Sequence, residues 1–429
     1  MVRLKDPLMG QKASKQLGHQ LVYKTKKNKS FLTKYSKPGS VKAFTPSLSQ
    51  EEKRIKYGQC VEEWRRKTQA EKEVYNNRAK GRSYSGWNLF LKECMLAPEG
   101  WVVDGYTYTT RRKLTIDHDL IDEDLVDFPV LVKLQSLPAV DFNKFNEDGH
   151  DIRFTKADGQ TLLKYERERH DKVNQKGEYW VKVPNISKDA DTDFYIYYRT
   201  EDTLDGEDPT NVWDNHFIAV YHLKESSGNA KDSTGNGHDG NFQGNLPMPI
   251  EGKIAKAQDL DGIGDYITMS VGTMANQTRE VWVSVDAFAQ YDGLVSSTSW
   301  VVGSGHFKIE NSPNNCITWH INQSGADNKR RWLNLLIGVY YYAVAIYRGA
   351  DGYMALYGNG DLKDSIYTQI GMTIQDVNRI GNEYNDARDI NGKIDEVRIS
   401  DIVRPPAYIK ATYHSGNNTL LTYGNEETP

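Results

Sequence analysis

The sequence predicts a mainly β protein with an extended basic amino-terminal arm and a small three-helix module. Three observations support this prediction. Alternating or β-branched runs separated by turn signals fill the chain after residue 105, helix-start motifs cluster between residues 47 and 100, and basic residues concentrate at the amino-terminal end. At 429 residues the chain has room for about three folded units. No apolar stretch approaches the roughly 18 residues that a membrane-spanning helix needs.

Charge is divided unevenly along the chain. The first 83 residues carry 21 Lys and Arg against 7 Asp and Glu, while the whole chain has a net charge of −4. A basic end on an acidic body favours a negative partner, such as nucleic acid, a membrane surface or the acidic face of another protein. A solubilising disordered tail is the alternative interpretation.

Residues 1–46 are interpreted as an extended anchoring arm. Apolar and polar residues alternate across residues 17–36, which suits strands that add to the sheet edge of a partner better than a solvated tail. We expect assembly through this arm to depend on its basic and aromatic residues, namely Lys24, Lys26, Lys27, Lys29, Phe31 and Tyr35.

A helical module is expected over residues 47–100. Ser49 and Thr68 each begin a capping-box pattern, with Glu52 and Glu71 three residues later, and a third helix is expected over residues 85–96 before a proline and a glycine. A domain of three short helices is only marginally stable by itself, so we expect it to pack against a larger structure. The three cysteines of the chain are too few and too scattered for a disulfide framework or a CxxC metal site.

Two local resemblances lie in this amino-terminal part. The pattern W-x3-T-x2-EK-x2-Y-x3-A at residues 64–79 resembles the second half of an HMG box, and S-x-W-x2-FL at residues 85–91 resembles its first helix. Their order is reversed, so DNA bending is not implied and a nucleic-acid partner is not expected. Residues 22–90, from VY through KP at 37–38 to SGWNLF at 85–90, resemble amino-terminal modules of phage and prophage structural proteins.

A β-sandwich is expected over residues 101–200. The motifs DIRF at 151–154, DG at 158–159, L-x-YE at 163–166 and WVKVP at 180–184 resemble an uncharacterised domain that commonly precedes laminin-G-like domains. The resemblance implies a compact sandwich of surface and adhesin-type proteins, with no known catalytic residues.

A second sandwich is expected over residues 214–425, after an acidic, proline-containing linker at residues 201–213. FIAVYHL at 217–223, DSTGNGHDG at 232–240, LDG at 260–262 and GKIDEVRIS at 392–400 resemble the concanavalin A-like, laminin-G-type jelly roll in family order and spacing. The resemblance implies two antiparallel sheets packed face to face, with one concave face.

The jelly-roll resemblance implies a calcium site. Related domains hold Ca²⁺ with an Asp of the final strand and with carbonyl oxygens of early loops. Asp395 has the matching position, and Gly262 and Gly264 lie near the expected carbonyl donors. The alternative is that Asp395 accepts hydrogen bonds from loop N–H groups without a metal. Ca²⁺ is the one cofactor that the sequence suggests.

Glycan binding is the activity that the resemblance implies. Sugar sites combine an aromatic platform with amides and carboxylates. The candidate platforms in the second half of the jelly roll are Trp300, Trp319, Trp332 and Tyr384. Catalysis is not expected, because the Glu-x-Asp-x-x-Glu strand of related glycanases is missing and no HExxH, GxSxG or P-loop motif occurs.

Together these features predict a non-enzymatic structural protein of a virion surface, made in the host cytoplasm since the chain starts without a signal-like apolar segment. A head decoration or head-surface role is expected, with the arm attached to other capsid proteins, a homo-oligomeric state, a host-surface glycan as a partner and no membrane partner. The alternatives are a tail or fibre protein, a prokaryotic cell-surface adhesin and an extracellular filament subunit.

Overall fold

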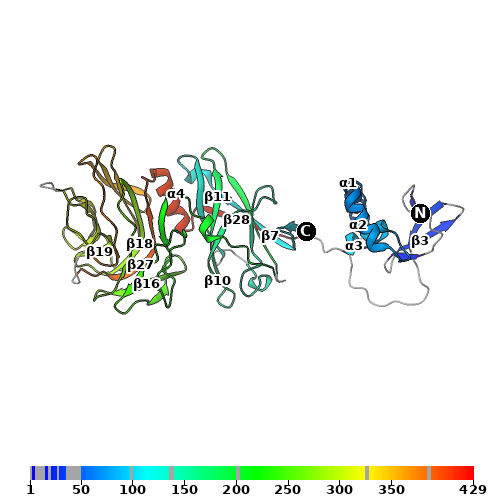
Figure 1. The fold of residues 1–429 in the computed structure, drawn as a ribbon, viewed down its shortest axis with the longest axis horizontal. Helices are drawn as coiled ribbons and strands as arrows, with labels where there is room; N and C mark the ends of the chain where they lie inside the picture. Colours follow the sequence, from blue (N-terminus) through cyan, green and yellow to red (C-terminus); the bar gives the residue numbers. More distant parts are fainter. Residues whose placement is uncertain are drawn as a thin grey trace. The chain divides into compact units, whose positions relative to one another are not determined.

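In the computed structural model the chain divides into two compact units, Met1–Ala97 and Pro98–Pro429 (Figure 1). The structure describes residues 2–4, 15–17, 21–26, 29–34, 50–96, 100–134, 140–199, 203–323, 328–383 and 388–429. The protein is mainly β with a small amino-terminal module of three helices, as the sequence predicts. None of the described helices combines the length and apolar character needed to span a membrane.

The described strands of the arm pair with one another. β1 (Val2–Leu4), β2 (Lys15–Leu17), β3 (Leu21–Lys26) and β4 (Lys29–Lys34) form an antiparallel sheet in the order β1-β4-β3-β2. Lys24 on β3 pairs with Phe31 on β4, and Lys26 pairs with Lys29. Lys27 and Tyr35 lie outside the described residues. The sequence led us to expect edges that join a partner's sheet, and within the chain β3 and β4 already form a hairpin.

Three helices follow the arm: α1 (Gln50–Arg66), α2 (Gln69–Ala79) and α3 (Gly86–Leu96). The predicted capping box of α2 is present, because the Thr68 side chain accepts from the Glu71 N–H while the Glu71 carboxylate accepts from the Thr68 N–H at 2.6 Å. The other predicted cap, Ser49, lies outside the described residues.

The helical module has a small core that a disulfide closes. Trp64, Trp87 and Phe90 pack with ring centroids 5.1–6.0 Å apart. Cys60 on α1 and Cys94 on α3 form a disulfide with their Cα atoms 6.0 Å apart. The expectation that the cysteines are too scattered for disulfides was therefore wrong for this pair, because 34 residues separate them along the chain and the packing of α1 on α3 brings them together.

The second unit begins with a β-sandwich. One sheet has the order β10-β11-β8 and the other the order β28-β7-β12-β9. The bounds are β7 (Thr110–Ile116), β8 (Leu125–Lys133), β9 (Arg153–Lys156), β10 (Tyr165–Asp171), β11 (Lys176–Ile186), β12 (Thr192–Tyr198) and β28 (Leu421–Glu427). A hairpin of β5 (Trp101–Val103) and β6 (Tyr106–Tyr108) precedes it, and its loops hold short 3-10 helices at His118–Leu120 and Phe142–Lys144.

The last strand of the chain belongs to this first sandwich. β28 runs antiparallel to β7, with Leu421 opposite Ile116 and Tyr423 opposite Leu114. The chain therefore leaves the first sandwich, forms the jelly roll, and returns to complete the first sandwich's sheet.

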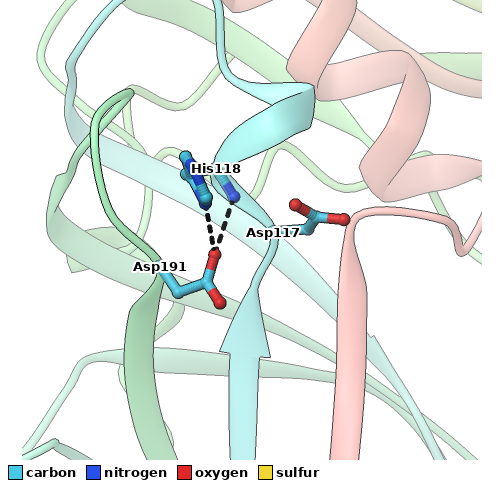
Figure 2. A group of neighbouring side chains, drawn as sticks. All are labelled: Asp117, His118 and Asp191. Atoms are coloured by element: carbon cyan, nitrogen blue, oxygen red, sulfur yellow. Dashed lines mark hydrogen bonds and ion pairs between the residues drawn. The ribbon is translucent and has the colours of Figure 1, made fainter.

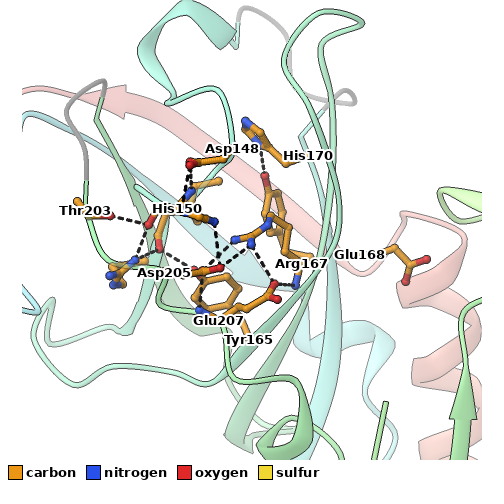
Figure 3. A network of polar contacts seen from close by, with 12 residues as sticks. Asp148, His150, Tyr165, Arg167, Glu168, His170, Thr203, Asp205 and Glu207 are labelled. Carbon is orange, nitrogen blue, oxygen red and sulfur yellow. Dashed lines mark hydrogen bonds and ion pairs between the residues drawn. The ribbon is translucent and has the colours of Figure 1, made fainter. Parts of the chain in front are cut away.

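The acidic segment between the two sandwiches is bound to the first one by a polar network, which Figure 3 shows. Arg167 donates to both carboxylate oxygens of Asp205, at 2.7 and 3.0 Å, and its main-chain N–H donates to Glu207. His150 contacts Asp205 at 3.1 Å, and the Thr203 hydroxyl donates to the His150 carbonyl oxygen. These contacts hold the described residues of the linker along β10. A 3-10 helix at Pro209–Asn211 follows it.

The jelly roll consists of two antiparallel sheets. The eight-stranded sheet has the order β15-β16-β27-β18-β23-β24-β25, with β13 also paired to β27. Its strands are β13 (Phe217–Tyr221), β15 (Pro249–Glu251), β16 (Lys256–Asp261), β18 (Asn276–Ala287), β23 (Tyr340–Arg348), β24 (Tyr353–Gly358), β25 (Asp361–Tyr367) and β27 (Asn391–Ser400).

The seven-stranded sheet has the order β14-β17-β26-β19-β20-β21-β22. Its strands are β14 (Asn241–Gln243), β17 (Tyr266–Thr268), β19 (Gln290–Ser296), β20 (Gly305–Glu310), β21 (Cys316–Ile321), β22 (Arg330–Trp332) and β26 (Arg379–Ile380). One apolar cluster fills the space between the two sheets.

A second apolar cluster joins the jelly roll to the first sandwich. It runs from the outer face of the eight-stranded sheet, through helix α4 (Pro406–Gly416), to strands of the first sandwich. Figure 1 shows α4 between the two sandwiches. The Tyr408 ring of α4 lies 5.0 Å from the Phe128 ring of β8, and Ser415 accepts a hydrogen bond from the Leu131 N–H. This face of the jelly roll is therefore covered, whereas the outer face of the seven-stranded sheet is directed away from the junction.

Candidate functional site

The outer face of the seven-stranded sheet carries polar and charged side chains. On β20, Phe307 and Ile309 point into the core, so that the alternate residues occupy the other face of the sheet. The same alternation holds for β21. The polar residues placed on the outer face in this way are His306, Lys308, Glu310, Thr318 and His320.

Trp300 lies over this polar face. Its side chain is 46% exposed, although its ring centroid is 4.2 Å from that of His306 and 5.5 Å from that of His320. The ammonium of Lys308 lies 5.5 Å from the indole centroid. One side of the indole is thus supported by two imidazoles, and about half of its surface is open to solvent.

Amide side chains and a glycine hold the Trp300 loop in place. The Asn322 amide donates to the Trp300 carbonyl oxygen, and Asn378 accepts from the Thr298 N–H at 3.2 Å. Gly303 has φ +87°, and a Cβ there would lie 2.4 Å from the Thr373 carbonyl oxygen, so the turn requires glycine. A loop fixed at both ends holds its indole in one orientation.

Glu383 organises the charges beneath Trp300. Its Oε1 lies 3.0 Å from the Lys308 ammonium and 3.1 Å from Nδ1 of His306. Burial opposes ionisation of this carboxyl, but the hydrogen bond from His306 and the charge of Lys308 lower its pKa to about 2. Glu383 is therefore ionised at neutral pH.

The two imidazoles of this face are neutral at pH 7. Burial, with the nearby ammonium of Lys308, lowers the pKa of His320 to about 3, and burial also lowers the pKa of His306. Within the described residues, Nε2 of His306 and Nδ1 of His320 are buried without a hydrogen-bond partner. These polar side chains are buried, so the part of this face that is open to a ligand is the exposed side of the Trp300 indole.

The predicted aromatic platforms lie at different places. Trp300 lies on the outer face, whereas Trp319 is fully buried and donates from Nε1 to the Ile346 carbonyl oxygen at 2.9 Å. Trp332 on β22 is half-buried and packs against Tyr341. Tyr384 lies outside the described residues. The structure thus places Trp319 in the core and does not bring Trp332 next to Trp300.

The residues predicted to hold calcium are not brought together. Asp395 is fully buried on β27, and its Oδ2 accepts from the Ile254 N–H at 2.9 Å. Gly262 instead packs against Asn391, and the Gly264 N–H donates to Asp389. Asn391, against which Gly262 packs, is four residues before Asp395 along an extended strand. The position of Gly262 is therefore about 13 Å from Asp395.

A cluster of three potential metal ligands lies at the surface of the first sandwich (Figure 2). Nδ1 of His118 is 2.6 Å from Oδ1 of Asp191, and the same oxygen accepts from the His118 main-chain N–H. Figure 2 shows the carboxylate of Asp117 turned away from that contact. Asp117 accepts from the Asp119 N–H instead, which caps a 3-10 helix. These hydrogen bonds account for the cluster as local structure.

A polar cleft of about 410 Å³ lies where the linker passes between the two sandwiches. Trp213 and Phe217 form its apolar part. Its polar lining consists mainly of Asp127, Lys182, Asn211, Asp214, Thr234 and Asn236. This cleft is a second candidate site in the described part of the chain.

Trp300 was among the residues predicted from the sequence, whereas the polar residues below it were not. The alternation in residues 305–310 (GHFKIE) shows one polar and one apolar face, but it does not show which loop covers the polar face. Glu383 comes from a segment 75 residues after Lys308, so no local pattern connects them.

Comparisons with known proteins identify two domains. Residues 261–410 match the family model of the concanavalin A-like lectin/glucanases superfamily, and residues 148–235 match a domain of unknown function, DUF2341. No curated protein matches the chain.

Several solved structures are similar to this chain at low identity. Domain 4 of AbnA, a GH43 extracellular arabinanase from Geobacillus stearothermophilus, in complex with arabinotriose, is 18% identical over 45% of this chain and 96% of its own, with a TM-score of 0.37. The binding domain of Paraclostridial Mosquitocidal Protein 1 is 14% identical over 47% of this chain and 52% of its own, with a TM-score of 0.37. The binding domain of botulinum neurotoxin serotype D is 16% identical over 46% of this chain and 51% of its own, also with a TM-score of 0.37. With the two family matches, the chain carries a concanavalin A-like jelly roll preceded by a DUF2341 domain.

Proposed function

We propose that this protein binds glycans through the outer face of the seven-stranded sheet, with Trp300 as the platform for a sugar ring. The half-exposed indole supported by His306 and His320 is the observation that carries this proposal. The weakly polar C–H face of a sugar packs on an indole, and its hydroxyl groups need hydrogen-bond partners at the edge.

The charge state of the face favours a neutral glycan. Both imidazoles are uncharged at pH 7, and the Lys308 ammonium is already paired with Glu383. The arrangement of the described residues supports binding.

Binding to an array of immobilised neutral and acidic glycans tests this proposal. We expect wild-type protein to bind a subset of neutral glycans and Trp300→Ala to lose at least about tenfold in affinity, while Trp300→Phe retains part of it. Leu336→Ala is the matched control, since Leu336 is an exposed apolar residue of another loop. If Trp300→Ala binds as well as the wild type, the platform is not at Trp300.

The cleft between the sandwiches is the second candidate location for the same activity. Its amides, carboxylates and buried indole of Trp213 have the composition of a sugar site. Binding that survives Trp300→Ala and is lost in Asn211→Ala would move the glycan to this cleft.

A role at a virion surface is the finer proposal, carried by the basic arm and by the resemblance of residues 22–90 to phage modules. In this proposal the arm attaches to other capsid subunits and the sandwiches present the glycan site. Deleting residues 1–46 should abolish incorporation into particles without unfolding the second unit. Unchanged incorporation would contradict the anchor, and the tail, fibre and adhesin alternatives would then be preferred. Calcium binding at Asp395 stays a prediction.

A further inference from the structure

A buried cluster of ionisable side chains joins the two sandwiches. Glu166 and Glu168 come from β10 of the first sandwich, His222 directly follows β13 of the jelly roll, and Glu396 and Arg398 come from β27. The side chains of Glu168 and Glu396 have no exposed surface, and that of His222 is 2% exposed. Charged groups at such depth need close partners.

The imidazole of His222 lies beside more carboxylates than it can donate hydrogen bonds to. Nδ1 is 2.6 Å from Oε1 of Glu396 and 2.7 Å from Oε2 of Glu168, and these three atoms lie within 4.8 Å of one another. Nδ1 carries at most one hydrogen, so it cannot donate a full hydrogen bond to both. Within the described residues, Oε1 of Glu168 is buried without any hydrogen-bond partner.

The surrounding residues fix the carboxylates in place. Nε1 of Trp180 donates to Glu168 at 2.8 Å, and Nε1 of Trp213 donates to Glu166 at 2.9 Å. Arg398 donates to Glu396 at 2.6 Å and lies 4.3 Å from the Trp180 ring centroid. Such outer partners orient ligands around a metal ion.

A divalent cation would balance the charges of the cluster without a proton on His222. Glu166, Glu168 and Glu396 are three carboxylates, against which stand Arg398 and, if protonated, His222. The ammonium of Lys224 is half-buried and donates to the main-chain oxygen of Glu168. With a neutral imidazole, a divalent cation and Arg398 together neutralise all three carboxylates.

We propose that Glu168, His222 and Glu396 bind a transition-metal ion such as Zn²⁺. Nδ1 of His222, Oε1 of Glu396 and both carboxylate oxygens of Glu168 supply four donors, which is the number that zinc prefers. Nδ1 of His222 now lies 2.6–2.7 Å from the two carboxylate oxygens. Zinc bonds of about 2.0–2.1 Å require ligand atoms about 3.3 Å apart, so a small side-chain movement makes room for the ion. A set that includes imidazole suits zinc better than calcium.

This site would hold the two sandwiches together. Glu168 belongs to the first sandwich and the other two ligands belong to the jelly roll, so the ion would bridge the two domains. An ion that binds the folded state and not the unfolded state raises the free energy of unfolding. Because the ion would contact both sandwiches, we expect both to be stabilised together. The inference is independent of the glycan site, which lies on the other sheet.

Metal content and thermal unfolding of the full chain test the proposal. Protein dialysed against EDTA is given one equivalent of Zn²⁺, passed through gel filtration and analysed for bound zinc, and Co²⁺ is used in parallel because its visible spectrum reports its coordination. We expect one zinc per chain, a Kd in the micromolar range or below, and a higher melting temperature with zinc.

Two variants and one matched control locate the ion. Glu168→Gln keeps an oxygen for the Trp180 N–H but removes the carboxylate, and His222→Gln removes the imidazole. Each should weaken zinc binding by about 100-fold or more. Asp191→Asn, in the exposed cluster of Figure 2, should leave binding unchanged.

The proposal is overturned if folded wild-type protein retains no stoichiometric zinc, because the charges of the carboxylates are then balanced by protons instead of a metal ion. It is also overturned if Asp191→Asn abolishes binding while Glu168→Gln does not. If His222→Gln fails to fold, Glu168→Gln and the cobalt spectrum of the wild type still decide the question.

Discussion

The two sheets of the jelly roll use their outer faces in opposite ways. On β23, Tyr341, Ala343 and Ala345 pack between the sheets, while Tyr342 and Val344 pack toward α4 and the first sandwich. The strand is apolar on both faces. On β20 and β21 the inward residues are mainly apolar, and the outward ones are two histidines, a lysine, a glutamate, a threonine and Cys316.

This difference indicates which face is left for a ligand. An apolar outer face needs a protein cover, and here the cover is α4 with the first sandwich. The outer face of the other sheet carries polar side chains that are themselves buried, with the half-exposed Trp300 above them. Continuous and alternating apolar patterns therefore distinguish the covered face from the polar face within one domain.

The largest expected effect is on the covered face. Trp282 is 2% exposed and packs 5.3 Å from the Tyr342 ring and 5.9 Å from the Tyr413 ring. Trp282→Ala removes this packing and leaves a cavity at the junction, so we expect the free energy of unfolding to fall by about 3–5 kcal/mol. Urea unfolding monitored by far-UV circular dichroism measures it. A loss below about 1 kcal/mol would show that this face does not need its cover.

A pH effect is expected on the open face. The pKa of His320 is lowered from 6.5 to about 3 by burial and by Lys308, His306 and Lys329, with Glu383 acting in the opposite direction. Between these pH values the unfolded chain binds more protons than the folded chain, so stability falls as the pH drops below about 6.5. The slope reaches about 1.4 kcal/mol per pH unit, or roughly 2–3 kcal/mol by pH 4.5.

The control for this effect is a second histidine. His320→Gln should flatten the acid limb of stability against pH, measured by urea unfolding between pH 7 and 4, whereas His216→Gln, at an exposed position, should not. An unchanged limb in His320→Gln would mean that the imidazole is protonated in the folded state.

Part of this architecture was predictable from the sequence and part was not. The Thr68 capping box, the three helices and the jelly roll follow local patterns, and all are present. The pairing of β28 with β7 is not readable, because its partner is more than 300 residues away and its register depends on the fold of both sandwiches.

The candidate site shows the same limit. The exposed Trp300 was recognised as a candidate, but buried Trp319 carries the same residue type in an equally plausible strand. The residues predicted to hold calcium are separated by the strand register. Asp261 is paired with Asn391 rather than with Asp395, so the loop of Gly262 and Gly264 lies beside a different part of β27. Motif spacing along the chain does not contain that register.

A matched pair of threonines compares the polar chemistry of the two faces. The Thr318 hydroxyl donates to the Glu310 carboxylate at 3.0 Å on the open face, and the Thr412 hydroxyl donates to the Tyr408 carbonyl oxygen at 2.9 Å in α4. Thr318→Val should cost about 1.5 kcal/mol or more, because it leaves a buried carboxylate without this donor, and Thr412→Val should cost about 1 kcal/mol or less. Equal losses in urea unfolding would show that the open face is no more dependent on charge than the covered one.

The smallest expected effect on stability is that of Trp300→Ala. Trp300 is 46% exposed where Trp282 is 2% exposed, so its removal should lower the free energy of unfolding by about 1 kcal/mol or less, while glycan binding is lost. The two tryptophans thus form one experiment, in which a residue of the covered face changes stability and a residue of the open face changes binding. A stability loss for Trp300→Ala as large as that for Trp282→Ala would make Trp300 a core residue, and the open face would then have no platform for a sugar.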